Sequence, residues 1–170
     1  MICPKCEIEM NKIQGNYHFT ECGLDNVYLK GALFKCSECG LELALFPNPE
    51  EFIPALTKFF VRQKERLNGS QILFLRKAMG QTGSALADFL GKSRVEISRW
   101  ENGRAFISPH LDMKFRSEVA KKLLSEQEAR EVEVALGDIF LHRYEETTTM
   151  QKITLTQSWS VVGSELAVPA

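Results

Sequence analysis

Two Cys-x-x-Cys pairs near the start of the chain constrain its fold more than any other feature. They are Cys3-Pro4-Lys5-Cys6 and Cys36-Ser37-Glu38-Cys39, with 29 residues between them. Each pair can turn tightly and aim two sulfurs at one point, so that together they offer four thiolates to one tetrahedral ion. Gly40 directly after the second pair suits the left-handed backbone of such a turn. The spacing exceeds the usual ~15–20 residues of a double-pair site, which predicts an insert that folds back.

Zn²⁺ is the ion that this ligand set favours, and we expect it to be structural. Four thiolates on Cys3, Cys6, Cys36 and Cys39 leave no open position for water or a substrate. The alternatives are two independent redox pairs or plain core cysteines. Residues 18–20, 27–29, 33–34 and 41–45 are β-prone or alternate like strands, which predicts a small zinc-ribbon-like sheet around the ion. The fifth cysteine, Cys22, is expected to be a buried or incidental thiol.

Overall composition is that of an ordinary globular protein. The 170 residues carry 21 Lys and Arg against 22 Asp and Glu, and 44% of them are hydrophobic. These values argue against a disordered chain, a collagen or a coiled-coil rod. No apolar run is long enough for a transmembrane helix, and the first residues lack the features of a signal peptide. We therefore expect a cytoplasmic protein without a membrane partner, whose thiols stay reduced.

The near-zero net charge hides a segregation along the chain. Residues 1–66 are close to neutral, residues 67–125 carry 10 basic and 5 acidic side chains, and residues 126–170 carry 3 basic and 8 acidic ones. A central segment with a net charge of +5 favours a polyanion as its partner. A solvated basic surface with no partner is the alternative.

The chain is expected to be an α+β protein in three parts. Residues 1–68 form a zinc-binding domain, residues 69–145 an all-α helix-turn-helix domain, and residues 146–170 a C-terminal extension. A helix over 49–67 is predicted to close the first part. A break follows at residues 67–70, where Gly69 can end one helix and Ser70 can cap the next.

The central segment contains the pattern of a helix-turn-helix. A first helix begins near Ile72 and ends at Gly80, and Thr82 can cap a second helix that Gly91 ends. Ser93 and Glu96 then match a capping box that starts a third helix. A short helix, a glycine turn and a capped helix make the helix-turn-helix arrangement.

The third helix would present one polar face. At about 100° per residue, Arg94, Val95, Ser98 and Arg99 share a face, while Ile97 and Trp100 point inward. Arginine can bind guanine O6 and N7 bidentately, and valine can contact the methyl group of thymine. The face therefore suits the major groove of double-stranded DNA. A solvated helix face is the alternative.

Further residues around this helix are candidates for phosphate contacts. Thr82 and Ser84 lie at the start of the second helix, where backbone N–H groups attract anions. Lys92, Asn102 and Arg104 flank the third helix. Each of these five residues also suits an ordinary turn or surface position.

Two ordered motifs together resemble a known family. The run from Leu86 to Gly91, followed by Ile97-Ser98-Arg99-Trp100-Glu101-Asn102-Gly103, resembles the XRE/Cro-type helix-turn-helix of bacterial and phage repressors. With the upstream cysteine pairs, residues 1–125 resemble the MqsA-like regulators, which join a YgiT-type zinc domain to an XRE domain. The resemblance implies a zinc site at the four cysteines and a homodimer that reads a palindromic operator through Val95, Ser98 and Arg99. It also implies a toxin protein as a partner, since several members are antitoxins.

The sequence thus predicts a DNA-binding transcriptional regulator, a repressor or antitoxin, with no enzymatic activity. It lacks a Ser-His-Asp pattern, a phosphate-binding glycine loop and an H-E-x-x-H motif. Two alternatives stay open. One is a protein-interaction module whose zinc domain neutralises a toxin, and the other is a stand-alone regulator with no toxin.

Overall fold

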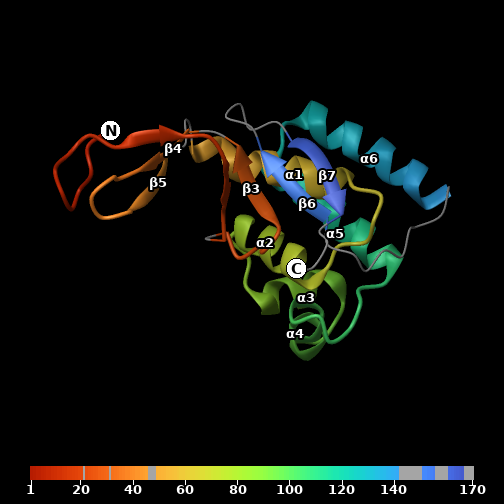
Figure 1. Cartoon of the computed structure of the whole chain (residues 1–170). Coiled ribbons are helices and arrows are strands. Elements are labelled where there is room, and N and C mark those ends of the chain that lie inside the picture. Colours follow the sequence, from red (N-terminus) through yellow and green to blue (C-terminus); the bar gives the residue numbers. More distant parts are fainter. Residues whose placement is uncertain (21, 31, 46–48, 142–150, 156–160, 167–170) are drawn as a thin grey trace. The chain divides into compact units, whose positions relative to one another are not determined.

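The computed structural model is an α+β protein made of two compact units. It describes residues 1–20, 22–30, 32–45, 49–141, 151–155 and 161–166. One unit comprises Met1–Phe52 and Thr149–Ala170, and we call it the cysteine unit. The other, Ile53–Thr148, is called the helical unit. Strands lie at both ends of the described chain and helices occupy its middle, so the expected fold class is confirmed at this level (Figure 1).

The cysteine unit holds two small sheets. The first has the antiparallel order β1-β4-β5 and the second the order β2-β3-β6-β7. Their strands are β1 (Asn11–Ile13), β2 (Asn16–His18), β3 (Val27–Lys30), β4 (Ala32–Lys35), β5 (Glu42–Leu45), β6 (Gln151–Leu155) and β7 (Val161–Leu166). Strands therefore form in or beside each segment that the alternating pattern marked in the insert between the cysteine pairs.

Part of the C-terminal extension belongs to the second sheet. β6 pairs with β3 in parallel, with Val27 opposite Ile153 and Leu29 opposite Leu155. All four of these side chains are buried. The predicted extension at 146–170 thus contributes a packed strand to the cysteine unit, and the rest of it outside 151–155 and 161–166 lies beyond the described residues.

The predicted helix over 49–67 is shorter than expected. A 3-10 turn, η1 (Pro49–Glu51), leads into α1 (Phe52–Arg62), so Lys64 and Arg66 lie beyond its end. Phe60 of α1 meets Phe74 edge to face at 5.7 Å between ring centroids. Because α1 packs on the helices that follow it, the division between the units falls after Phe52, whereas the sequence placed a boundary after residue 68.

The first helix of the predicted motif starts with a different cap. α2 (Gly69–Ala78) has Asn68 as its N-cap, and the Asn68 side chain accepts a hydrogen bond from the Gln71 backbone at 3.0 Å. In turn, the Gln71 side-chain oxygen accepts a hydrogen bond from the Asn68 backbone N–H at 2.9 Å. The prediction of Gly69 as a C-cap and Ser70 as an N-cap was wrong, because this reciprocal pair satisfies two backbone donors that Ser70 would not reach.

The next two helices follow the prediction closely. α3 (Gly83–Leu90) is capped by Thr82 and ends at Gly91, whose φ of 66° is left-handed. α4 (Arg94–Glu101) begins with a complete capping box between Ser93 and Glu96. The short turn between these helices fixes their relative direction, since few other backbone paths join two capped ends so tightly.

Two longer helices complete the helical unit. α5 (Pro109–Leu123), which the sequence reading missed, packs beside α6 (Glu126–Leu141) (Figure 1). Asp112 and Arg116 form a fully buried ion pair on α5 at 2.8 Å. Burial raises the pKa of Asp112 to about 6 and lowers that of Arg116, while each charge stabilises the other.

Candidate metal centre and nucleic-acid interface

Both cysteine pairs sit in turns of the same kind. In the first, the backbone N–H of Glu7 bonds to the Cys3 carbonyl at 3.0 Å, and in the second Gly40 N–H bonds to the Cys36 carbonyl at 3.1 Å. The residue after each pair has a left-handed backbone, with φ of 59° at Glu7 and 69° at Gly40. Glycine adopts this conformation without cost, so the sequence signal was clear at Gly40 and absent at Glu7.

The two turns bring four sulfurs to one place. The Sγ atoms of Cys3, Cys6, Cys36 and Cys39 all lie within 4.8 Å of one another, and none is in a disulfide. Cys3 Sγ is 3.7 Å from Cys39 Sγ. A tetrahedral Zn²⁺ with bonds of about 2.3 Å needs sulfurs about 3.8 Å apart, so the cluster fits such an ion with small adjustments. The four cysteines are therefore compatible with a metal site.

Ionisation of the cluster is uneven. Burial opposes the ionisation of Cys3, but hydrogen bonds from the backbone of Lys5 and Cys6 lower its pKa to about 7. A hydrogen bond with the Cys39 side chain, together with burial, raises the pKa of Cys6 to about 12. Thiolates this close repel one another, so all four can be charged together only when a cation compensates them.

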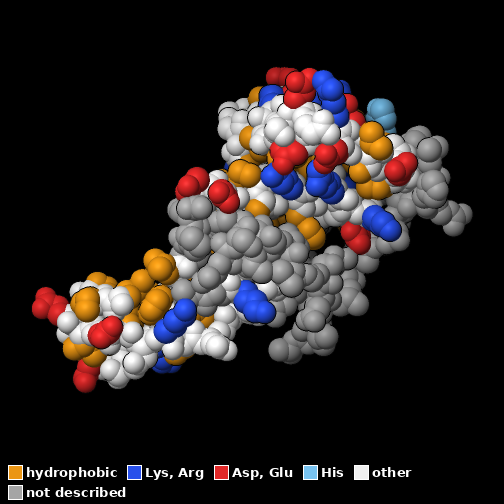
Figure 2. Space-filling model, turned by 90° about the horizontal axis from the view of Figure 1, so that it is seen from above, with side chains coloured by type: hydrophobic (Ala, Val, Ile, Leu, Met, Phe, Trp, Pro, Cys, Tyr) orange, Lys and Arg blue, Asp and Glu red, His pale blue; other side chains and the backbone are white. Residues whose placement is uncertain are grey.

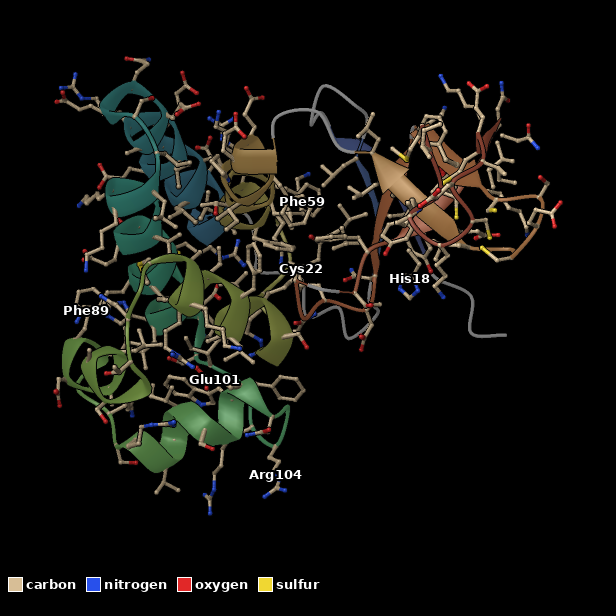
Figure 3. All side chains as sticks on the ribbon, turned by 90° about the vertical axis from the view of Figure 1, so that its left-hand side faces the viewer. His18, Cys22, Phe59, Phe89, Glu101 and Arg104 are labelled. Carbon is tan, nitrogen blue, oxygen red and sulfur yellow. The ribbon has the colours of Figure 1, made fainter. Side chains whose placement is uncertain are left out.

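Two further side chains of the cysteine unit that could bind a metal, those of Cys22 and His18, are not part of the cluster. Cys22 is half-buried, and its thiol donates to the Phe19 carbonyl at 3.5 Å. His18 stacks on Tyr28 with ring centroids 4.7 Å apart, and its Nε2 lies 2.6 Å from the Asp25 carbonyl. Figure 3 labels His18 and Cys22. Both residues therefore have local structural partners.

A second candidate site lies on the exposed face of α4. An open hollow of about 540 Å³ is lined by six side chains: Arg94, Val95, Ser98, Arg99, Asn102 and Arg104. The structure thus brings together the four residues expected on the polar face and two of the expected flanking residues. Val95 is 62% exposed, whereas Ile97 and Trp100, on the inward side of α4, are buried. Figure 3 shows Arg104 pointing away from the body of the helical unit.

The three arginines of this hollow differ from four of the other five arginines described. Arg62, Arg76, Arg116 and Arg130 are each in an ion pair with a carboxylate. Within the described part of the chain, Arg94, Arg99 and Arg104 have no such partner. The hollow therefore presents three uncompensated guanidinium groups, an arrangement that attracts an anion.

On another face of the helical unit, the charges are balanced. Figure 2 shows basic and acidic side chains next to one another over one face of this unit. The described part of this unit contains the ion pairs Lys58–Glu128 at 2.6 Å and Lys121–Glu133 at 2.8 Å. Such compensated pairs have little excess field with which to attract a polyanion.

Of the other predicted contact residues, Thr82, Ser84 and Lys92 do not line the hollow, whereas Asn102 does. Thr82 accepts a hydrogen bond from the Ala85 backbone at 3.1 Å, so its oxygen already caps α3. Ser84, two residues further on, is exposed. Lys92 lies 3.3 Å from Glu96, which partly neutralises it. Asn102 donates to the Ser98 carbonyl at 2.7 Å, and so it also ends α4.

Contacts beneath α4 hold it in place, and sequence reasoning missed them. Glu101 receives two hydrogen bonds from Arg76 of α2, at 2.5 and 3.3 Å, in a largely buried pair. Arg76 also donates to the Gln81 carbonyl at 2.7 Å. The charges at Arg76 and Glu101 carried no spacing signal, since the two residues belong to different helices. The pair fixes the end of α4 opposite its capping box.

We compared the chain with known protein families, curated proteins and solved structures. No family model, curated protein or solved structure matches the chain. Among the described helices, none combines the length and apolar character needed to cross a membrane.

Proposed function

We propose that this protein is a sequence-specific, DNA-binding transcriptional regulator that reads double-stranded DNA with α4. The observation that carries the proposal is the hollow on α4, where Arg94, Arg99 and Arg104 lack carboxylate partners and form the lining together with exposed Val95 and half-buried Ser98. A phosphate backbone supplies the negative charge, and base edges supply acceptors for arginine and methyl groups for valine.

The support beneath α4 favours reading of base edges over a loose electrostatic contact. Specific readout needs side chains held in register with the groove, and α4 is fixed by its capping box and by the Arg76–Glu101 pair. Arg99 is the residue best suited to a bidentate contact with guanine, because it is an exposed arginine on the polar face. Ser98 and Val95 lie beside it.

One helix of this length covers only half of an ordinary operator. A homodimer with two-fold symmetry would place two copies of α4 about 34 Å apart, in successive major grooves of a palindrome. Occupancy of a promoter by such a dimer blocks transcription without any chemistry in the protein. We therefore propose a repressor with no enzymatic role.

We also propose that the four-cysteine cluster holds structural Zn²⁺. Cys3, Cys6, Cys36 and Cys39 would supply a complete thiolate shell, which anchors the two turns and the first sheet to each other. The resemblance to antitoxins extends the proposal to a toxin as a second partner of this unit.

The test is recovery of bound duplexes from a random-sequence pool by the full-length protein, followed by titration with the enriched duplex and a scrambled one. Arg99→Ala should lose about 1–3 kcal/mol of discrimination between them. Arg130→Ala is the matched control, since it removes an exposed arginine that pairs with Glu126 on α6. Enrichment of no common sequence, or unchanged discrimination by Arg99→Ala, would overturn the proposal.

A further inference from the structure

The start of α3 leaves an unusual space, and the side chain of Arg94 fills it. Gly83 is the first residue of α3 and is buried. A Cβ built on Gly83 would lie 2.5 Å from both Cζ and Nε of Arg94, and 3.0 Å from its Nη1. The guanidinium group of Arg94 therefore lies against the backbone of the first turn of α3, where any other residue would displace it.

This position sets Arg94 apart from the rest of the α4 face. Arg94 is the first residue of α4, and side chains of a helix lean toward its N-terminus. Its guanidinium is thereby carried to the neighbouring helix start, whereas Val95 and Arg99 project from the length of α4. Arg94 is therefore placed apart from Val95 and Arg99, the side chains that can reach base edges in the major groove.

The surroundings of the Arg94 guanidinium are positive. The first N–H groups of α3 have no partner within the helix and carry the positive end of its dipole. Among the described residues, no carboxylate pairs with Arg94. Lys92 lies two residues before it, and the nearby Glu96 is already bound to Lys92 and to Ser93. A cation held in this place is best compensated by an external anion.

We propose that Arg94 binds a phosphate of the DNA backbone, and that Gly83 is a positioning residue that makes room for it. The inference rests on the proposed DNA-binding function and divides the hollow into two roles. Arg94 holds the protein on the backbone at the start of α3, while Arg99 and Val95 read the bases. Phosphate contacts fix register and orientation, and base contacts carry the sequence information.

The first experiment separates a phosphate contact from a base contact by salt dependence. Full-length wild type, Arg94→Ala, Arg94→Lys and Arg99→Ala are titrated with the enriched duplex and with a scrambled duplex over a range of salt concentrations. Arg94→Ala should weaken binding to both duplexes roughly tenfold at about 0.1 M salt. It should also reduce the steepness with which the logarithm of the association constant falls with log salt by about 0.9. Arg94→Lys should retain the slope, because a lysine can still neutralise a phosphate. Arg99→Ala should weaken binding to the enriched duplex only.

The second experiment asks whether Gly83 acts through Arg94. Gly83→Ala moves only the end of a flexible side chain, so the fold should be retained while binding to both duplexes weakens several-fold. In the Arg94→Ala background the same change should have no effect, since there is no guanidinium left to displace. Gly137→Ala is the matched control, because a Cβ at this helical glycine meets nothing within 4 Å.

The outcomes distinguish this inference from the function on which it rests. Wild type that binds neither duplex overturns both. Wild type that binds the enriched duplex selectively, with Arg94→Ala losing selectivity at an unchanged salt slope, overturns the phosphate role alone and makes Arg94 a base reader. Equal effects of Gly83→Ala with and without Arg94 show that the glycine acts by another route, and they overturn its positioning role.

Discussion

At the scale of single residues, a missing side chain decides how closely two helices approach. A Cβ on Gly69, the first residue of α2, would lie 2.3 Å from the Trp100 carbonyl oxygen and 2.7 Å from that of Glu101. These are backbone atoms, which cannot rotate away as the end of a side chain can. The start of α2 therefore rests directly on the last turn of α4, the helix of the candidate interface.

Gly69→Ala should consequently destabilise the helical unit by about 1–3 kcal/mol, the usual cost of overpacking. The change would otherwise favour the helix by up to about 1 kcal/mol. Gly137→Ala, in open space on α6, should show that gain without the cost. Urea unfolding followed by circular dichroism measures both variants, and equal free energies of unfolding for the two would contradict the proposed close contact.

Residue-level chemistry was predictable wherever it depends on local spacing. The four cysteines come together as their spacing indicated, and the arc of α4 presents Arg94, Val95, Ser98 and Arg99 to solvent as the 3.6-residue period requires. The contacts of Gly69 with α4 and of Gly83 with Arg94 were not predictable. They depend on the distance between helices, which no spacing within one helix encodes.

At the scale of elements, the side-chain caps of α3 and α4 were predicted from the sequence, whereas the Asn68 cap of α2 was missed. The capping box at Ser93 and the cap at Thr82 set the first residues of α4 and α3. The start of α6 has the same chemistry, since Ser125 accepts from the Glu128 backbone at 3.4 Å and Glu128 accepts from the Ser125 backbone at 3.0 Å. Glu128 also binds Lys58 of α1 at 2.6 Å, so this cap ties two helices together.

This cap makes part of the stability dependent on pH. The hydrogen bond from Lys58, followed by those from Ser125, lowers the pKa of Glu128 to about 2 from its ordinary 4.5. A carboxyl whose pKa is lower in the folded state stabilises the fold above about pH 4.5 and loses that contribution as the pH falls toward 2. Because the pair is partly exposed, its contribution is about 1 kcal/mol.

The comparison of wild type with Glu128→Gln isolates this contribution, since glutamine can keep the capping hydrogen bond but not the charge. At neutral pH the wild type should be more stable by about 1 kcal/mol. The difference should disappear between pH 4.5 and pH 2, as measured by urea unfolding at a series of pH values. A difference that stays constant over this range would rule out the charge as its source.

α5 was missed for a physical reason that its own residues supply. Two of its inward positions hold Asp112 and Arg116, so the apolar stripe that marks a buried helix face is interrupted. Its first residue is Pro109, and Ser108 makes no side-chain cap, so the sequence has no capping box that would predict the start of this helix. The proline at the first helical position was the one signal present.

At the scale of the whole molecule, the cysteine unit is built from both ends of the chain. Residues 152–156 alternate between polar and apolar side chains, which is typical of a strand, but this pattern does not identify the strand's partner. β6 lies parallel to β3, and a bond from the Ile153 backbone to the Asn26 carbonyl at 2.8 Å fixes the register. The helical unit is thus an insertion within the unit that contains the four cysteines.

This arrangement predicts that metal removal affects the two units unequally. In the cysteine unit, the core around the cluster consists of Cys3, Cys36 and Met10 with a few half-buried side chains, which is too small to be stable alone. A structural zinc ion contributes about 10–16 kcal/mol to folding in small domains. The helical unit has a separate apolar core, including Leu56, Phe115 and Val119, which contains none of the four ligands.

Chelation should therefore unfold the cysteine unit while the helices persist. Hydrogen exchange should lose protection in β1, β4 and β5 but keep it in α2 to α5, and far-ultraviolet circular dichroism should retain most of its helical signal. Cys39→Ser should have the same effect together with loss of one zinc per chain, and because Cys39 is exposed, this change leaves no cavity to explain the result. Cys22→Ser, outside the cluster, should keep the metal. Simultaneous loss of protection in both units would show that the helical unit depends on the metal, and a full zinc content in Cys39→Ser would remove this residue from the ligand set.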